Sequence, residues 1–222
     1  MTPALRTLLA LSLCDNYNKW IGDLCRPHLG DGIANAEIGC GVGNVLQYLG
    51  DTTVGFDPDN RVCMIARGVT GSQRIFNESL EAMHASRDHN QADCLVCVNV
   101  LEHIEHDCVA LCQMRDLLKP GGKLCLFVPA HPWLYGSVDK AVGHYRRYTR
   151  RGVLDKMRLA GFGIVDVRWF NPLGVAGWAV NNLLKQKHPS LLSVMAFDKL
   201  VPILRKWQRP PVGLSLFAVG EK

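Results

Sequence analysis

The sequence predicts an α/β fold in which a largely parallel sheet carries helices on both faces. Short apolar runs bounded by glycine, proline or polar residues recur along the chain, which is typical of buried strands. Stretches with helical spacing separate most of these runs, and such alternation implies crossover connections between parallel strands. With 222 residues, of which 48% are hydrophobic, the chain is long enough for one sizeable core, so we expect a single domain over residues 1–222.

The apolar runs give the expected strands, which lie at residues 34–38, 53–56, 94–100, 123–128, 164–170 and 214–219. The clearest helical spacing runs from 105 to 118 and stops at residues 119–122, Lys-Pro-Gly-Gly, because proline and glycine terminate helices. A further helix is expected at 149–160. We also expect a helical N-terminal extension at 1–30 and a helical insertion at 172–211, before the last strand.

Composition narrows the class of protein. The nine cysteines follow no disulfide framework and several lie inside apolar runs, which fits a reducing cytoplasm. Cys94 and Cys97 form a CxxC pair, but residues three apart in a strand point to opposite faces, so no metal site is expected. No run reaches the roughly 18 apolar residues that span a bilayer, so any membrane contact should be peripheral. A net charge of +5 suits an anionic small substrate or a phospholipid surface and does not by itself indicate nucleic acid.

A glycine-rich turn follows the first expected strand. Residues 37–44 read Glu-Ile-Gly-Cys-Gly-Val-Gly-Asn and should close that strand and open a helix, where an open parallel sheet binds ligands. Glycines let the backbone turn sharply and approach a ligand. A dinucleotide fingerprint needs its third glycine where Asn44 stands, which disfavours NAD. Asp57 ends the next strand, where a carboxylate can accept hydrogen bonds from both hydroxyls of a ribose.

Together these features resemble the class I S-adenosylmethionine-dependent methyltransferases, and the resemblance covers nearly the whole chain. It rests on the glycine turn, on Gly55-Phe56-Asp57, on residues 93–103 and on residues 117–122. The resemblance implies a Rossmann-like fold with a mostly parallel seven-stranded sheet, S-adenosylmethionine as cofactor, and in-line methyl transfer. For such a displacement a protein chiefly holds donor and acceptor in attack geometry and excludes water.

The resemblance also implies that three groups of residues surround the cofactor. In the first group, Glu37 helps to orient the methionine end and the glycines of the turn line the cofactor. The second group lies at its ribose and adenine, and the third lies near the reactive sulfonium. These residues are Glu37, Gly39, Cys40, Gly41 and Gly43; Asp57, Pro58, Asn77, Glu78 and Ser79; and Asn99, Val100 and Leu101.

The acceptor side is expected on residues 129–148, a long connection without an apolar period of its own. His144 is the leading candidate for a general base, because histidine titrates near neutral pH, and Asp139 and His103 are further catalytic candidates. The expected acceptor-binding residues are His131, Tyr135, Tyr145, Arg146 and Arg147. The two guanidinium groups suit a phosphate or carboxylate, but the alternative is that they tie the segment to the sheet through internal ion pairs.

Residues 139–149, which contain Gly-His-Tyr-Arg-Arg-Tyr-Thr, also resemble a subgroup of bacterial methyltransferases encoded near glycan or lipid pathways. We therefore expect a methyltransferase for a small-molecule, glycan-linked or lipid-linked acceptor. Nucleic acid is disfavoured because the Asn-Pro-Pro-aromatic signature of base methylation is missing. Two alternatives stay open: a catalytically silent subunit that binds S-adenosylmethionine and, less favoured, an NAD-dependent oxidoreductase.

Overall fold

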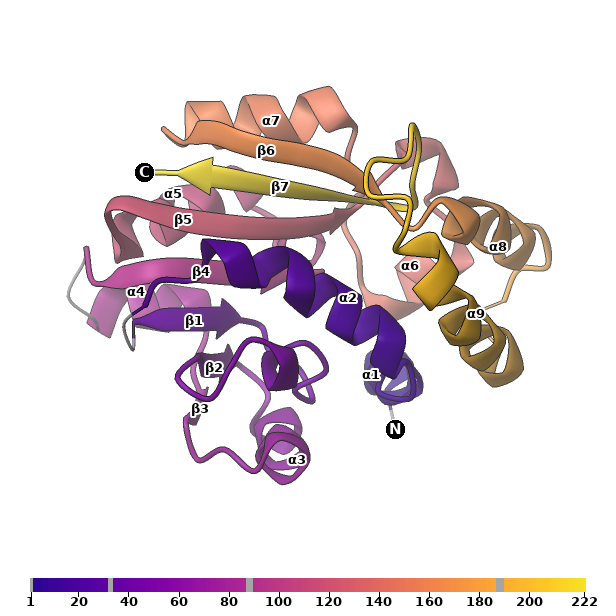
Figure 1. Ribbon diagram of the computed structural model, residues 1–222, viewed down its shortest axis with the longest axis horizontal. Helices are drawn as coiled ribbons and strands as arrows, with labels where there is room; N and C mark the ends of the chain where they lie inside the picture. The colour runs from indigo at the N-terminus through magenta and orange to yellow at the C-terminus, as the bar shows by residue number, and fades with distance from the viewer. Residues whose placement is uncertain (1, 32–33, 87–89, 187–189) are drawn as a thin grey trace.

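The computed structural model describes residues 2–31, 34–86, 90–186 and 190–222. It has one seven-stranded sheet in the order β3-β2-β1-β4-β5-β7-β6, in which only β7 runs antiparallel to its neighbours. The strands are β1 (Asn35–Ile38), β2 (Val54–Asp57), β3 (Ile75–Asn77), β4 (Ala92–Val98), β5 (Leu118–Pro129), β6 (Gly163–Phe170) and β7 (Ser215–Glu221). The predicted α/β fold with a mostly parallel seven-stranded sheet is confirmed (Figure 1).

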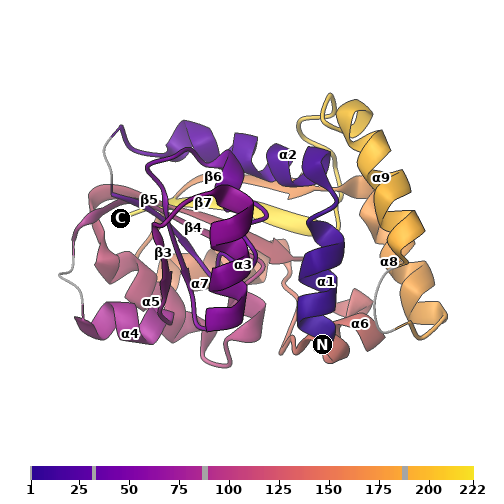
Figure 2. The same ribbon diagram turned by 90° about the horizontal axis from the view of Figure 1, so that it is seen from below.

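Helices cover both faces of this sheet (Figures 1 and 2). One core cluster holds apolar residues of α4 (Leu80–Ser86), α5 (Asp107–Leu117) and α7 (Arg150–Leu159). A second holds those of α2 (Asp15–Cys25), α3 (Asn60–Thr70) and α9 (Leu191–Leu204). Cys97 belongs to the first cluster and Cys94 to the second, because side chains three residues apart in a strand face opposite sides.

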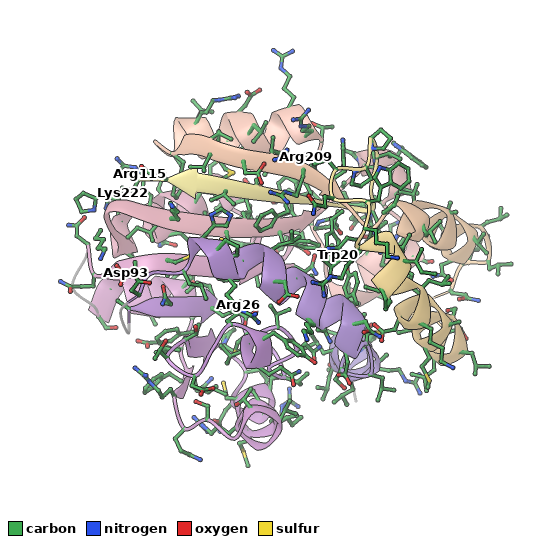
Figure 3. The ribbon with its side chains drawn as sticks, viewed as in Figure 1. Trp20, Arg26, Asp93, Arg115, Arg209 and Lys222 are labelled. Carbon is green, nitrogen blue, oxygen red and sulfur yellow. The ribbon has the colours of Figure 1, made fainter. Side chains whose placement is uncertain are left out.

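Four helices gather at the carboxyl ends of the parallel strands, which we call the cofactor edge. In Figure 1 the arrowheads of β1, β4 and β5 point toward this edge, where α1 (Pro3–Leu11), α6 (Ser137–Val142), α8 (Pro172–Leu183) and α9 lie. Trp20 of α2, labelled in Figure 3, packs on Phe170 at the end of β6, with ring centroids 4.0 Å apart. Carboxyl ends of parallel strands are where such sheets bind ligands, so the helices surround the expected site. In the described part of the chain, no helix has both the length and the apolar character to cross a membrane.

Two local expectations are wrong. The glycine turn does not open a helix: residues 41–49 form turns and one 3-10 turn, η2 (Leu46–Tyr48). The turn keeps a positive φ of +84° at Gly43, and the following N–H groups of Tyr48 and Leu49 bond three residues back, which prevents an α-helix from forming.

The second correction concerns residues 129–148, which were expected to form a loop. They contain a 3-10 turn, η4 (Pro132–Leu134), and α6. The Asp139 carboxylate accepts a hydrogen bond from the Gly136 N–H at the start of α6, and Gly143, with φ of +87°, ends it. A bridge between Ala130 and Tyr148 closes the segment at its base. The segment is therefore a short folded unit rather than a loop.

The other boundaries shift by a few residues. The helix expected from 105 begins at Asp107, and the strand expected over 94–100 ends at Val98. Two further 3-10 turns, η1 (Arg26–His28) and η3 (Leu101–His103), follow α2 and β4. Helices α1 and α2 lie within the expected N-terminal extension, and α8 and α9 within the expected insertion, of which residues 1 and 187–189 lie outside the described residues.

Candidate functional site

The glycine turn after β1 has a backbone that only glycine adopts easily. Gly39 and Gly41 have φ of +67° and +54°, and a Cβ on Gly39 would lie 2.4 Å from a methyl group of Val100. A Cβ on Gly41 would lie 3.3 Å from the Leu8 side chain, and the Asn44 side-chain amide donates to the Leu8 carbonyl at 3.0 Å. Helix α1 therefore lies directly over the turn, so a side chain at Gly41 would press against Leu8.

Asp57 at the end of β2 faces the same turn. Its Oδ2 accepts a hydrogen bond from the Gly41 N–H and its Oδ1 one from the Asp59 N–H, each at 2.9 Å. Burial raises the pKa of Asp57, and these two backbone donors oppose that rise. Each oxygen keeps a further lone pair, so the carboxylate can still accept two hydroxyl groups.

The other candidates for the ribose and adenine end continue from Asp57. The Asn77 side-chain amide and the Glu78 N–H both donate to the Asp57 carbonyl at 3.0 Å, and the Ser79 hydroxyl accepts the Ala82 N–H at the start of α4. Pro58 follows Asp57 in the chain. The structure thus brings these predicted residues together at the end of β2 and β3.

The residues expected at the glycine turn and those expected near the sulfonium meet at the carboxyl ends of β1 and β4. The Cys40 N–H donates to the Phe56 carbonyl at 2.9 Å, and Cys40 itself is buried. Asn99 follows β4 with φ of +52°, and Leu101 is fully buried behind it. The close approach of Val100 to Gly39 joins the two groups.

Glu37 on β1 is buried, and its Oε2 has no hydrogen-bond partner among the described residues. Burial, with a smaller contribution from Asp57, raises the pKa of Glu37 well above its usual value. A buried carboxyl oxygen without a partner costs free energy. A cationic group of a bound molecule would supply that partner, so the residues at these strand ends fit S-adenosylmethionine, whose α-ammonium and sulfonium groups are cationic.

Asp139 organises the acceptor side. It is fully buried and accepts hydrogen bonds from His144 Nδ1 and Arg147 Nε at 2.8 Å each and from Trp178 Nε1 at 3.3 Å, besides the Gly136 N–H. Although burial opposes ionisation, the His144 hydrogen bond and the charge of Arg147 hold the pKa of Asp139 below its usual value. Because an ionised carboxylate only accepts, His144 must carry a proton on Nδ1, which in the neutral imidazole leaves Nε2 as the acceptor.

Glu102 and His103 follow β4 and face His144. Glu102 is 0% exposed, and its two carboxyl oxygens have no hydrogen-bond partner among the described residues. Burial raises the pKa of Glu102 to about 8, so the carboxyl is largely neutral at pH 7. His144 Nε2 lies 3.8 Å from Glu102 Oε1, and the His103 and His144 ring centroids are 4.6 Å apart. His103 is exposed, and desolvation by the surrounding protein, followed by the charge of His144, lowers its pKa.

One ligand atom from each of Glu102, His103 and His144 lies within 4.8 Å of the others. Two imidazoles and a carboxylate are a donor set that transition metals bind. The sequence pointed to no metal site, since it offers no paired ligand motifs, and this cluster is the place where that expectation can be tested.

The two candidate arginines have internal partners. Arg146 bonds the Asp107 carboxylate at 2.9 Å and the Glu105 carbonyl at 2.6 Å. Arg147 is buried, bonds the Ala130 carbonyl at 3.0 Å and lies over the Trp178 ring at 4.5 Å. This arrangement favours the alternative in which both guanidinium groups fasten the segment to the sheet.

Of the remaining acceptor-side candidates, Tyr135 and Tyr145 lie beside His144, and His131 packs against β6. The Tyr135 hydroxyl donates to the His144 carbonyl at 2.7 Å, and the Tyr145 N–H donates to the Glu102 carbonyl at 2.8 Å. His131 stacks on Trp169, with centroids 5.0 Å apart, and its buried Nε2 has no partner among the described residues. The exposed ring of Tyr145 is thus available to a bound molecule, whereas His131 Nε2 is buried.

Sequence comparison places the chain among known proteins. Residues 25–167, more than half of the chain, match the family model described as a methyltransferase domain. The chain is 29% identical to the ubiquinone biosynthesis O-methyltransferase of Roseobacter denitrificans over 68% of its own length and 69% of that protein. The Escherichia coli protein of the same name is 25% identical over 68% of this chain and 62% of its own length. The crystal structure of a SAM-dependent methyltransferase from Archaeoglobus fulgidus shares the fold, with a TM-score of 0.64 at 13% identity over 92% of this chain and 94% of that one.

Proposed function

The chain belongs to the methyltransferase-domain family and is an S-adenosylmethionine-dependent methyltransferase, and we propose that it methylates a hydroxyl oxygen of a small-molecule, glycan-linked or lipid-linked acceptor. The family assignment replaces the NAD-dependent alternative. We assign the base to His144 and the ribose contact to Asp57. We also propose that the Gly-His-Tyr-Arg-Arg-Tyr-Thr segment places the chain in the subgroup associated with glycan or lipid pathways.

The hydrogen bond between Asp139 and His144 carries this proposal. Bound S-adenosylmethionine supplies a methyl group on a cationic sulfur, and a hydroxyl acceptor becomes a good nucleophile when it loses its proton. His144 Nε2 takes that proton, and the positive charge that develops on the imidazole is stabilised by the Asp139 carboxylate on its other nitrogen. The same pairing would give little advantage to an acceptor without a proton to lose.

The position of His144 supports the same assignment. The Tyr145 N–H bonds the Glu102 carbonyl, which holds the His144 segment against the turn that follows β4. That turn begins with Asn99, which we assign to the neighbourhood of the sulfonium. The names of the relatives identify oxygen as the atom that those proteins methylate, which favours a hydroxyl here.

The test is methyl transfer to a panel of phenolic and lipid-linked hydroxyl acceptors, with and without His144. His144→Ala should lower kcat by roughly a hundredfold or more while the Kd for S-adenosylhomocysteine changes less than about twofold. His106→Ala, at an exposed histidine before α5, is the matched control and should leave kcat unchanged. Turnover that survives in His144→Ala would exclude the base assignment.

Two further outcomes separate the alternatives. Loss of wild-type turnover after dialysis against EDTA, with recovery on adding a divalent metal, would assign the Glu102, His103 and His144 cluster to a metal ion. Tight binding of S-adenosylhomocysteine without turnover on any hydroxyl acceptor would favour the silent subunit.

A further inference from the structure

Helix α8 turns an entirely apolar face away from the protein. Leu173, Val180 and Leu183 are its exposed large residues, Leu184 directly after it is exposed as well, and the other exposed positions of the helix, 176 and 177, are alanine and glycine. All six lie on one side of the helix, since they recur at intervals of three and four residues. A surface helix normally buries its apolar side and exposes its polar side, so α8 is inverted.

The inner side of α8 explains this inversion. Trp178 donates to Asp139, the Asn182 side-chain amide donates to the Leu134 carbonyl at 2.6 Å, and the Ser137 hydroxyl donates to the Gln186 carbonyl just beyond the helix at 2.5 Å. The polar groups of α8 are therefore used to hold the segment that carries His144. The apolar groups remain on the outside, next to the acceptor side of the site.

Helix α9 adds a second exposed apolar face at the same end of the molecule (Figures 1 and 2). Its Val194 and Val201 are buried against the protein, and Asp198 accepts a hydrogen bond from the Tyr17 N–H of α2 at 2.9 Å. The opposite side exposes Leu192 and Ile203, with Met195 between them. Leu183 at the end of α8 and Leu192 at the start of α9 are 82% and 80% exposed, so the tip of the helix pair is leucine-rich.

The charged residues of the segment that contains α8 and α9 are basic, with one exception. Between residues 172 and 213 the sequence has six Lys and Arg residues and a single acidic residue, Asp198, which faces inward. Arg205 and Arg209 pair with Asp23 and Asp166. The exposed Lys199 and Lys206 form no ion pair with described residues. Lys199 lies on the outer side of α9, and Lys206 lies in the turn after it, between the exposed Ile203 and Trp207.

From these observations we propose that the outer faces of α8 and α9 dock the protein onto an anionic phospholipid surface. The leucines enter the boundary between headgroups and acyl chains, to a depth of about 5–10 Å. Lys199 and Lys206 bury their aliphatic stems beside them and extend their ammonium groups to the lipid phosphates. No element needs to cross the bilayer.

A protein partner fits this surface less well than a membrane does. The centre of a protein–protein interface is depleted in lysine, because burying an ammonium group without a partner is costly. Here Lys199 and Lys206 stand beside exposed apolar residues, where a membrane boundary accommodates them. The absence of exposed carboxylates from the same stretch avoids repulsion from anionic headgroups.

The experiment is co-sedimentation of the full chain with vesicles of phosphatidylcholine mixed with phosphatidylglycerol, and with vesicles of phosphatidylcholine alone. The wild type should bind the mixed vesicles, and the double variant Leu183→Asp/Leu192→Asp should bind them at least about tenfold more weakly. Leu159→Asp on α7 is the matched control, since Leu159 is 83% exposed but lies away from α8 and α9, and its binding should equal the wild type. Lys199→Glu/Lys206→Glu should weaken binding to the mixed vesicles, and added salt should do the same.

The Kd for S-adenosylhomocysteine should stay within about twofold of the wild type in every variant, because these exposed side chains lie outside the cofactor edge. Failure of the wild type to bind the mixed vesicles would overturn the proposal, and so would an equal loss in Leu159→Asp. Self-association that the double variant abolishes, without vesicle binding by the wild type, would identify this face as an interface between two copies of the chain.

Discussion

The cofactor edge and the acceptor side of this methyltransferase are built by different means. At the cofactor edge, backbone conformation and backbone hydrogen bonds shape the site: Gly39 and Gly41 adopt positive φ, and Asp57 accepts a hydrogen bond from the Gly41 N–H of the turn. On the acceptor side, side chains from distant segments meet, and Asp139 collects His144 and Trp178 around one buried carboxylate. The cofactor edge therefore depends on glycines, which have no side chain, whereas the acceptor side depends on the charge of a buried carboxylate.

The largest effect should come from removing the charge at the centre of the acceptor side. Asp139→Ala leaves the buried guanidinium of Arg147 without its anionic partner and should lower the free energy of unfolding by about 3–5 kcal/mol. Urea denaturation followed by circular dichroism measures it. Asp155→Ala is the control, because its pairs with Arg151 and Arg158 are exposed and should contribute less than about 1 kcal/mol. A loss as small as the control's would mean that Asp139 does not hold the segment.

At the cofactor edge, the second prediction replaces a glycine of the turn with a residue that has a bulky side chain. Gly41→Val should weaken binding of S-adenosylhomocysteine by roughly a hundredfold or more, because the side chain presses against Leu8 and strains the backbone. Calorimetry measures the affinity, and the far-ultraviolet circular dichroism must stay native. Gly68→Val adds the same side chain on α3, where a Cβ meets nothing within 4 Å, and should bind as the wild type does. Normal binding by Gly41→Val would refute a close approach of ligand to this turn.

On the acceptor side, the third prediction concerns how Glu102 makes the free energy of unfolding depend on pH. Its pKa is raised to about 8 in the folded protein, so the fold binds the proton more tightly than the unfolded chain does. Its contribution to stability is therefore complete below the unfolded pKa, near 4.5, and is lost as pH rises toward 8. Compared with Glu102→Gln, the wild type should lose on the order of 2 kcal/mol between pH 5 and pH 8. Parallel stability curves for the two proteins would show that Glu102 is not held neutral.

The smallest effect belongs to the ribose contact. Asp57→Ala should weaken binding of S-adenosylhomocysteine by at least about 1 kcal/mol, because buried hydroxyl groups would lose a charged acceptor. The same variant should keep turnover at saturating cofactor far better than His144→Ala does. Titration by calorimetry, with kcat measured in parallel, separates the two. Unchanged affinity would refute the ribose assignment.

The two regions also differ in how far the sequence predicts them. The alternation of apolar runs and helical spacing predicts the sheet, and the segments around Gly39 and Asp57 can be recognised because their chemistry is local. The charge cluster is not local: Trp178 reaches Asp139 across 39 residues, and no periodicity announces that contact. The sequence did not identify Glu102 as a site residue, because the residues around it do not indicate that its carboxyl is buried without a hydrogen-bond partner.

The wrong expectations have a common physical origin. The helix expected after the glycine turn and the loop expected over 129–148 were both inferred from local composition. Tertiary contacts decided otherwise: Asn44 bonds α1, and Asp139 caps α6 while it binds Arg147. Local preferences are weak compared with a buried hydrogen bond to a charged group.

The place of β7 between β5 and β6 has a consequence for biogenesis. Residues 215–221 are translated after both β5 and β6, yet they pair with both of these strands over their whole length. Until they emerge, β6 has no strand to pair with and β5 exposes a free edge, which is the kind of surface that recruits chaperones or other nascent chains. The sheet is therefore complete only after residues 215–221 have been translated.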